Sequence, residues 1–212
     1  MQNLMRLISW RALLCLCLGF VFSGIGASLY IYCGLGADAF NVLNQGLARS
    51  LGIQVGTASC LTQGVLLALV LPFGKPYLGV GTLLGSFLIG CVMNVCAIVF
   101  SSPLQTANLA LRLCFLALAP FFVGFGIALI RRSNLGLTPY DVVPLLLHRK
   151  THNLAFFAVR ISVDAFSFLI GTILGGTIGI GTILSVVLTG PAIQIAAAIL
   201  AHSKKVVRLT HF

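Results

Sequence analysis

The segment Phe22-Ser23-Gly24-Ile25-Gly26 returns one hundred positions later as Phe122-Val123-Gly124-Phe125-Gly126. Both copies are apolar and contain the same two glycines. Two more segments repeat at the same interval, Leu35-Gly36 as Leu135-Gly136 and Gly79-Val80-Gly81-Thr82 as Gly179-Ile180-Gly181-Thr182. The chain therefore contains two copies of one repeat unit. Because each copy is almost entirely apolar, the unit is interpreted as a set of membrane helices.

Composition places the chain in one class of protein. Of its 212 residues, 59% are hydrophobic and only 8% are charged, and the mean hydropathy is +1.10. An ordinary soluble domain has roughly 45–50% apolar and about 25% charged residues. No Ser/Pro-rich linker or low-complexity tract interrupts the pattern, so residues 1–212 are predicted to form a single domain in a lipid bilayer.

Apolar stretches of roughly 17–25 residues are long enough to cross a bilayer. The sequence contains six of them, near 10–32, 55–73, 78–100, 109–131, 153–174 and 180–201. Each repeat, about 10–100 and about 109–201, then holds three spans. An odd number of crossings starts the second copy on the opposite side of the bilayer. The predicted fold is therefore an all-α bundle of six transmembrane helices in two inverted three-helix repeats.

The basic residues support this count. With the N-terminus in the cytoplasm, only Arg49 and Arg112 lie near the membrane in outer loops. The cytoplasmic side then collects Arg6, Arg11, Lys75, Arg131, Arg132, Arg149, Lys150, Lys204, Lys205 and Arg208. The positive-inside rule therefore predicts that both termini are cytoplasmic. The net charge of +10 reflects this topology and attraction to anionic lipid.

The most polar segment of each repeat lies between its first and second spans. In the first copy it runs from Gly34 to Arg49, and in the second from Asn134 to Arg149. Neither segment is long or apolar enough to cross the membrane. A glycine-rich break followed by a short half helix is the expected structure. In the second copy, Thr138 is the predicted N-cap and Pro139 the first helical residue.

Two of the three acidic residues lie in these segments. Asp38 occupies the position of Thr138, and Asp141 occupies the position of Asn41. The spacing within each segment is typical of a capping box, whose side chains satisfy free N–H groups at a helix start. A broken helix can also expose a polar site for a ligand or coupling ion inside the bundle. The two roles are compatible.

The third acid, Asp164, falls in the middle of the predicted helix 153–174, one turn after Arg160. This spacing permits an i,i+4 ion pair. A charge at that depth is costly and is a functional-site hypothesis by default. Two interpretations stay open. Either the pair locks two helices together, or Asp164 carries a proton or cation and Arg160 holds an anionic group.

Three amides complete the predicted site. Asn94 and Gln194 occupy equivalent positions in the third span of each repeat, whereas Gln63 has Val163 as its counterpart. Hydrogen bonding between helices is the common use of such amides, yet the pairing also nominates one central site. The predicted substrate-binding residues are Asp164, Arg160, Asp38, Asn41, Asp141, Thr138, Asn94, Gln194 and Gln63.

The other motifs indicate no further chemistry. The cysteines form no Cys-x-x-Cys and have no histidine at ligand spacing, so no metal, cofactor or catalytic group is predicted. Gly-x-Gly-Thr at 79–82 and 179–182 lacks the pattern of a nucleotide-binding loop. It is expected to begin a helix capped by Thr82 or Thr182. Nucleic-acid binding is not predicted, because the chain has no basic face or motif for it.

The chain resembles the YczE-type bacterial integral membrane proteins, relatives of the YitT/YyaS group. The similar segments are Leu35-Gly36-Ala37-Asp38-x-x-Asn41-Val42-Leu43, Gly46-Leu47-Ala48, and Gly-x-Gly-Thr with Gly90 or Gly190-Pro191 in the following helix. Family members typically read Gly-Ala-Asp-Pro-Trp-Asp-Val-Leu in the first copy. Here Ala39, Phe40 and Asn41 stand in place of Pro, Trp and the second Asp. The resemblance implies a multi-pass protein of the bacterial plasma membrane and assigns no activity.

The leading functional prediction is secondary transport of a small solute or ion, by rocking of the two halves around a site at the middle of the membrane. The alternative is a non-transporting accessory protein that regulates or stabilises a partner through its lipid-facing helices. That alternative predicts a tightly packed core without a solvated pocket. An enzyme ranks lower, because no nucleophile and base are paired in the sequence. The sequence is compatible with a homo-oligomer or a membrane partner.

Overall fold

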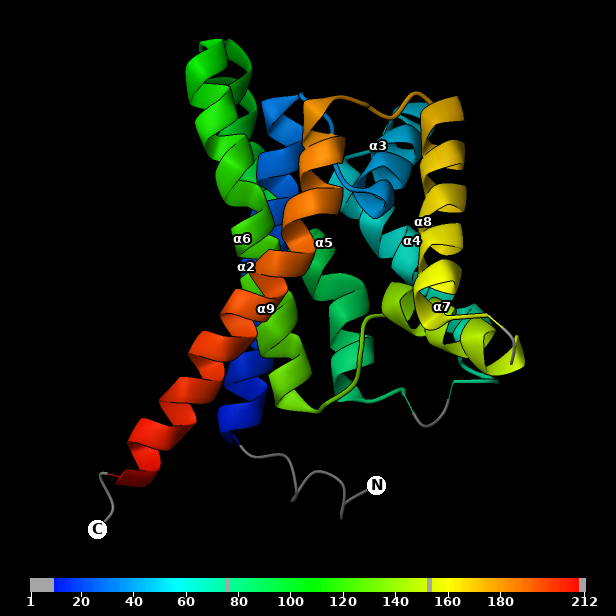
Figure 1. Cartoon of the computed structure of the whole chain (residues 1–212). Helices are drawn as coiled ribbons and strands as arrows, with labels where there is room; N and C mark the ends of the chain where they lie inside the picture. The colour runs from blue at the N-terminus through cyan, green and yellow to red at the C-terminus, as the bar shows by residue number, and fades with distance from the viewer. Residues whose placement is uncertain (1–9, 75–76, 152–153, 210–212) are drawn as a thin grey trace.

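The computed structural model describes residues 10–74, 77–151 and 154–209, and the regular structure in these ranges is entirely helical (Figure 1). Six longer helices match the six predicted apolar stretches, and a short helix follows the first long helix of each repeat, as predicted. In chain order the helices are α2 (Trp10–Cys33), α3 (Ala39–Leu51), α4 (Val55–Val70), α5 (Val80–Thr106), α6 (Leu109–Ser133), α7 (Pro139–Lys150), α8 (Phe156–Ile173) and α9 (Ile180–Leu209).

The expected six spans need a correction. Within the described ranges, five helices are long and apolar enough to cross a bilayer, namely α2, α5, α6, α8 and α9. The predicted span 55–73 corresponds to α4, which has only 16 residues and qualifies only together with α3, to which it is bent by 109°. The bend arises because Gly52 ends α3 in the left-handed conformation, with φ +65°. The described residues thus contain five candidate spans, or six if this bent pair counts as one.

The helices of the two copies are interleaved. α2 and α6 pack against each other in the centre, α5 packs on α2, and α9 packs on α6. The short helices cross over, because α3 packs on α8 of the second copy and α7 packs on α4 of the first. The start of α2 and the end of α9 lie at one end of the bundle, called here the terminal end (Figure 1). α7 lies toward the terminal end and α3 toward the opposite end.

The loop before each short helix docks on the other copy. The backbone N of Gly81 donates to the carbonyl of Leu135 at 2.8 Å, and Gly181 donates to Leu35 at the same distance. The hydroxyl of Thr82 accepts a hydrogen bond from the backbone N of Gly79 at 3.1 Å. Thr82 therefore stabilises the helix start, although the N-cap is Gly79 and not Thr82 as expected.

The second copy differs from the first at this helix start. The backbone of Thr182 donates to the carbonyl of Gly179 at 3.0 Å, as Thr82 does to Gly79. The hydroxyl of Thr182, however, is buried and has no hydrogen-bond partner among the described residues. The expected capping role is therefore met by the Thr82 side chain and not by that of Thr182.

Replacing Gly136 with alanine is expected to lower the free energy of unfolding by about 1–3 kcal/mol. Gly136 has φ +115°, and an added Cβ would lie 2.7 Å from Oγ1 of Thr82 and 2.9 Å from the backbone N of Gly79. Thermal unfolding in detergent measures the change. Gly64→Ala is the control, because a Cβ there would meet no atom within 4 Å. Equal effects of the two substitutions would show that loop docking contributes little.

Candidate functional site

Two N-caps organise the starts of α3 and α7. Asp38 accepts a hydrogen bond from the backbone N of Asn41 at 3.0 Å, and Thr138 accepts one from the backbone N of Asp141 at 3.4 Å. The capping roles predicted for these segments are therefore confirmed. In both helices the residue three positions after the cap also bonds the cap through its side chain.

The two short helices begin close together inside the bundle. Phe40 and Tyr140 occupy equivalent positions in the two copies, and their ring centroids lie 4.5 Å apart. Because α3 lies toward the opposite end and α7 toward the terminal end, their N-termini face each other across this aromatic contact (Figure 1). The positive ends of two helix dipoles thus meet at one place.

Arg160 joins α8 to the start of α7. Its Nε donates to Oδ2 of Asp164 at 3.2 Å, which confirms the predicted i,i+4 pair. Its Nη1 donates to Oδ1 of Asp141 at 2.7 Å, and the other oxygen of Asp141 accepts the hydroxyl of Thr138 at 2.7 Å. The side chains of the three ionised residues are 27–37% exposed. The Arg160–Asp141 pair links α8 to α7, as a structural lock does. Its side chains are also accessible to solvent, as a binding site requires.

Tyr140 lies at the centre of this cluster and was not among the predicted residues. Its hydroxyl donates to Oδ1 of Asp164 at 2.6 Å and lies 3.3 Å from Oγ of Ser167. The guanidinium carbon of Arg160 lies 5.3 Å from the centre of its ring. The backbone N of Tyr140 donates to Oε1 of Gln63 at 3.2 Å, which brings that predicted residue to the cluster.

A sequence signal for Tyr140 did exist. Residues 139–142 of the second copy read Pro-Tyr-Asp-Val, which matches the Pro-Trp-Asp-Val of the family pattern with one aromatic residue replacing another. In the first copy Phe40 stands at this place. Applied to both copies, the pattern would have selected Tyr140 together with Asp141.

Asp38 completes the cluster from the α3 side. Its carboxylate accepts a second hydrogen bond, from Nδ2 of Asn41 at 2.7 Å, and lies close enough to interact electrostatically with Asp164 and Arg160. The chain has only three acidic residues. All three therefore gather around Arg160, although they come from three segments far apart in the sequence.

Burial raises the pKa of two groups that lie outside the five candidate spans. It raises the pKa of the Asp38 carboxyl above its usual value, and the hydrogen bonds from Asn41 oppose this effect. Burial and the neighbouring Asp164 carboxylate raise the pKa of the Tyr140 phenol well above its usual value. Tyr140 therefore keeps its proton and is the donor in its hydrogen bond to Asp164.

A pocket of about 520 Å³ lies beside the cluster and has Asp141 and Arg160 in its wall. The rest of the wall comes from Tyr77, the end of α6, the 134–137 loop, α7 and the start of α8. In Figure 1 these segments lie toward the terminal end. The volume is within the range of small-molecule sites, about 300–1,000 Å³. The ion pair can therefore be reached from the terminal end.

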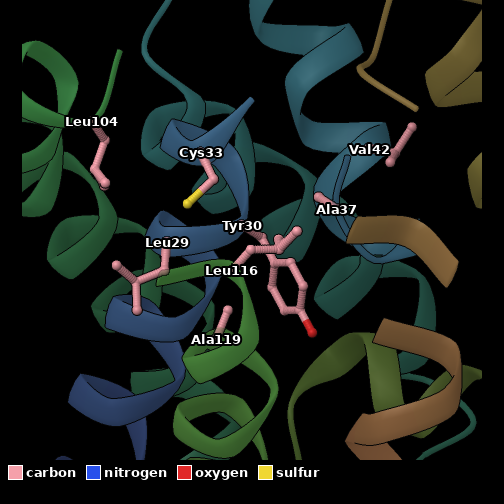
Figure 2. Close-up of a cluster of buried hydrophobic side chains, with 8 residues drawn as sticks. All are labelled: Leu29, Tyr30, Cys33, Ala37, Val42, Leu104, Leu116 and Ala119. Carbon is pink, nitrogen blue, oxygen red and sulfur yellow. The ribbon is translucent and has the colours of Figure 1, made fainter. Parts of the chain in front are cut away.

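Two of the equivalent positions at the opposite end are tightly packed. Tyr30 and Ala37, the counterparts of the pocket residues Ile130 and Leu137, are fully buried. Figure 2 shows both in a hydrophobic cluster with Leu116 and five other side chains. That cluster consists of Leu29, Tyr30, Cys33, Ala37, Val42, Leu104, Leu116 and Ala119. One end of the bundle is thus open beside the ion pair and the other is filled.

Polar contacts also close the opposite end. Arg49 donates to the carbonyl of Gly175 and, at 3.0 Å, to Oγ1 of Thr177. The backbone N of Thr177 donates to Oε1 of Gln45 at 3.0 Å. At the terminal end the counterpart of Arg49 is Arg149, which lies over the ring of Tyr77 at 5.3 Å. α3 is thus held to the 175–177 turn by hydrogen bonds, whereas α7 contacts the equivalent turn through a cation–π contact.

Two predicted residues lie apart from the cluster. Asn94 donates to Oγ1 of Thr57, between α5 and α4, so it serves helix packing there. Gln194 is exposed on α9 and makes no hydrogen bond with the described residues. Their equivalent places in the repeats do not bring them together, because α5 and α9 flank different central helices.

Replacing Tyr140 with phenylalanine is expected to lower the free energy of unfolding by about 1.5–3 kcal/mol, the usual range for a hydrogen bond to a charged group. The substitution removes the O–H donor to Asp164 and keeps the ring against Phe40. Chemical or thermal unfolding in detergent measures it. Tyr32→Phe is a matched control, because the Tyr32 hydroxyl bonds no described residue. A loss no larger than in the control would mean that the Asp164 contact is dispensable.

Known proteins similar to this chain are of unknown activity. A Haemophilus influenzae protein, described as uncharacterized, is 30% identical over 179 residues, covering 84% of this chain and 80% of the relative. The uncharacterized protein YyaS of Bacillus subtilis is 28% identical over 180 residues, 84% of this chain and 88% of its own. The uncharacterized membrane protein YczE of the same organism is 26% identical over 174 residues, which cover 81% of this chain and 79% of the relative. No solved structure matches the chain significantly.

The match to a family model covers most of the chain. Residues 10–198 match the model described as a family of unknown function, DUF6198. This range contains the whole cluster around Arg160 and the pocket beside it. The resemblance to YczE and YyaS is confirmed, and with its apolar helices the chain is a multi-pass membrane protein. The chain belongs to the DUF6198 family.

Proposed function

We propose that the chain is a secondary transporter of a small solute or ion in the bacterial plasma membrane. The observation that carries the proposal is the convergence of all three acidic residues with Arg160 at the facing starts of two half helices. Charges inside an apolar bundle are costly and are usually kept for substrate or ion pathways. Opposed half helices around a central site are a common design of transporters.

Contacts between equivalent residues support two inverted halves. Phe22 stacks on Phe122 with ring centroids 5.7 Å apart, and Phe40 meets Tyr140. A residue can touch its own counterpart only close to an axis that relates the two halves. The paired loop contacts of Gly81 and Gly181 are also equivalent across such an axis. A two-fold axis in the membrane plane accounts for all of these pairs.

The difference between the two ends supports alternating access. The 520 Å³ pocket reaches Asp141 and Arg160 from the terminal end, while Ala37 and Gln45, which are equivalent to the pocket residues Leu137 and Leu145, are buried at the opposite end. If the two halves exchanged these arrangements, the opposite end would open and the terminal end would close, so that the site would face the other side of the membrane. With both termini in the cytoplasm, as the basic residues predict, this conformation is the inward-facing one.

The pocket also bears on the alternative function. An accessory protein that acts only through its outer surface needs no polar space beside its ion pair, and its core is expected to be filled. The pocket, together with side chains that are 27–37% exposed at the ion pair, favours a protein that binds a ligand there.

A thermal-unfolding screen of the purified protein tests the proposal. Pooled amino acids, thiols, organic acids and inorganic cations are compared on the wild type and on Asp164→Asn. The variant keeps the Arg160–Asp141 pair, and its amide oxygen can still accept the Tyr140 hydroxyl, so it is expected to fold. One class of compound is expected to raise the unfolding midpoint of the wild type and not that of the variant, because a ligand stabilises the state that binds it.

The control for this screen is Gln194→Leu, which removes a polar side chain from α9 outside the cluster. It is expected to respond to the ligand as the wild type does. If no class of compound stabilises the wild type and Asp164→Asn is merely less stable, the transport proposal fails. Identification of a protein partner would then be the next step.

A further inference from the structure

The hydrogen-bonding capacity of the cluster is unevenly used. Each of the four carboxylate oxygens of Asp141 and Asp164 already accepts a hydrogen bond, from Arg160, Thr138 or Tyr140. Each oxygen keeps a second lone pair, so a cation or amine that entered the pocket would share these oxygens with the donors already bound to them. Every carboxylate oxygen of Asp141 and Asp164 is therefore already hydrogen bonded before any ligand arrives.

The donors of the pocket are largely free. A guanidinium carries five N–H donors, and Arg160 uses only Nε and Nη1, so its Nη2 is left for a ligand. Arg131 lines the same pocket, and its guanidinium makes no hydrogen bond or ion pair with the described residues. The side-chain amide of Asn134, also in the wall, is likewise unpaired in the described part of the chain. The pocket thus offers free donors and one cation, Arg131, that no described carboxylate balances.

Apart from Asp141 and Tyr77, the rest of the wall is apolar. Ile130, Leu137, Leu145 and Phe156 line the pocket beside the two arginines. A ligand that fits both parts carries an anionic group at one end and a hydrocarbon body at the other. A planar carboxylate also matches the fork of a guanidinium, which can bind it through two parallel hydrogen bonds.

We propose that this pocket binds a small organic carboxylate, with its anionic group between Arg131 and Arg160 and its carbon skeleton against the apolar wall. This assignment rests on the proposed transport function and names the class of its substrate. Arg131 acts as the outer contact, because it is exposed at the end of α6, and Arg160 as the inner one. An anionic lipid headgroup presents similar chemistry, and the experiment separates the two sources.

The experiment measures the unfolding midpoint of the full chain in detergent with matched probes. Monocarboxylates from acetate to benzoate are each compared with the amine of the same carbon skeleton, from ethylamine to benzylamine, and with added phosphatidylglycerol. At least one carboxylate is expected to raise the midpoint by roughly 5–10 °C at one hundred times its Kd, while its amine counterpart has no effect.

Two neighbouring arginines provide the variants. Arg131→Gln is expected to weaken carboxylate binding about tenfold or more, because it removes a charge-assisted contact. Arg132→Gln removes the same charge one residue later, where the side chain donates to the carbonyl of Leu200 on α9, and is expected to bind like the wild type. Both variants keep the cluster around Arg160 intact, so a change in binding is not a consequence of its loss.

Three results would overturn the assignment. Stabilisation by an amine that is lost in Asp164→Asn would make the substrate cationic and would leave the transport proposal standing. Stabilisation by phosphatidylglycerol alone, lost in Arg131→Gln, would make the pocket a lipid site. If no carboxylate raises the unfolding midpoint but another class of compound does so in the broader screen, the carboxylate assignment is wrong and the transport proposal stands. If no compound raises the midpoint in either screen, the carboxylate assignment and the transport proposal both fail.

Discussion

Replacing Arg160 with methionine is expected to lower the free energy of unfolding by about 2–3 kcal/mol. Removing one partner of a fully buried ion pair costs about 3–5 kcal/mol, because the remaining charge is left unpaired. Arg160 balances two carboxylates, Asp141 and Asp164, and interacts with Asp38 as well. Its side chain is 33% exposed, so solvent in the pocket reduces the cost below that of a fully buried pair. Unfolding in detergent measures the loss.

Rescue by neutral partners makes this prediction specific. The triple variant Arg160→Met with Asp141→Asn and Asp164→Asn removes the carboxylates together with the cation, and is expected to recover most of the lost stability. Its amides can still accept from Thr138 and Tyr140. Arg132→Met is the control for loss of an arginine that bonds a backbone carbonyl outside the cluster. If the single and triple variants are equally unstable, Arg160 stabilises the protein through packing and not through charge.

Local features of this fold follow from the sequence. Thr138 and Asp38 cap the short helices because their side chains satisfy N–H groups three residues ahead, and that spacing is readable without a structure. The pair of Arg160 and Asp164 follows in the same way from the periodicity of one helix. These predictions concern residues that are neighbours along the chain.

The contacts between segments could not be read in that way. Arg160 also pairs with Asp141, nineteen residues away, and this depends on how α7 and α8 pack. The crossing of α3 onto α8 depends on the 109° bend after Gly52, which shortens α4 and turns α3 away from it. Asn94 bonds Thr57 between α5 and α4, the interhelical use that is common for such amides. Equivalent positions in the two repeats did not predict a shared site here, because α5 packs mainly on α2 and α4 whereas α9 packs on α6.

The largest expected effect concerns the two ends of the bundle. Positions 45 and 177 at the opposite end are equivalent to 145 and 77 at the terminal end. Gln45 and Thr177 are hydrogen bonded at 3.0 Å, whereas Leu145 and Tyr77 line the open pocket. In a chain whose native cysteines are replaced, a short bifunctional thiol reagent is expected to bridge Gln45→Cys with Thr177→Cys rapidly. It should bridge Leu145→Cys with Tyr77→Cys slowly, at the rate at which the halves exchange.

Arg49 is expected to control the rate at which Leu145→Cys and Tyr77→Cys are bridged in proteoliposomes. Arg49→Ala removes two hydrogen bonds that hold α3 to the 175–177 turn. Their loss is worth about 1–2 kcal/mol, so bridging of 77 and 145 is expected to accelerate about tenfold as the opposite end opens. Arg112→Ala is the matched control, because Arg112 bonds the carbonyl of Cys33 and leaves that turn untouched. If the cysteines at 77 and 145 are bridged at the same rate with and without Arg49, opening of the opposite end does not promote closing of the terminal end. The two ends would then not exchange their open and closed arrangements.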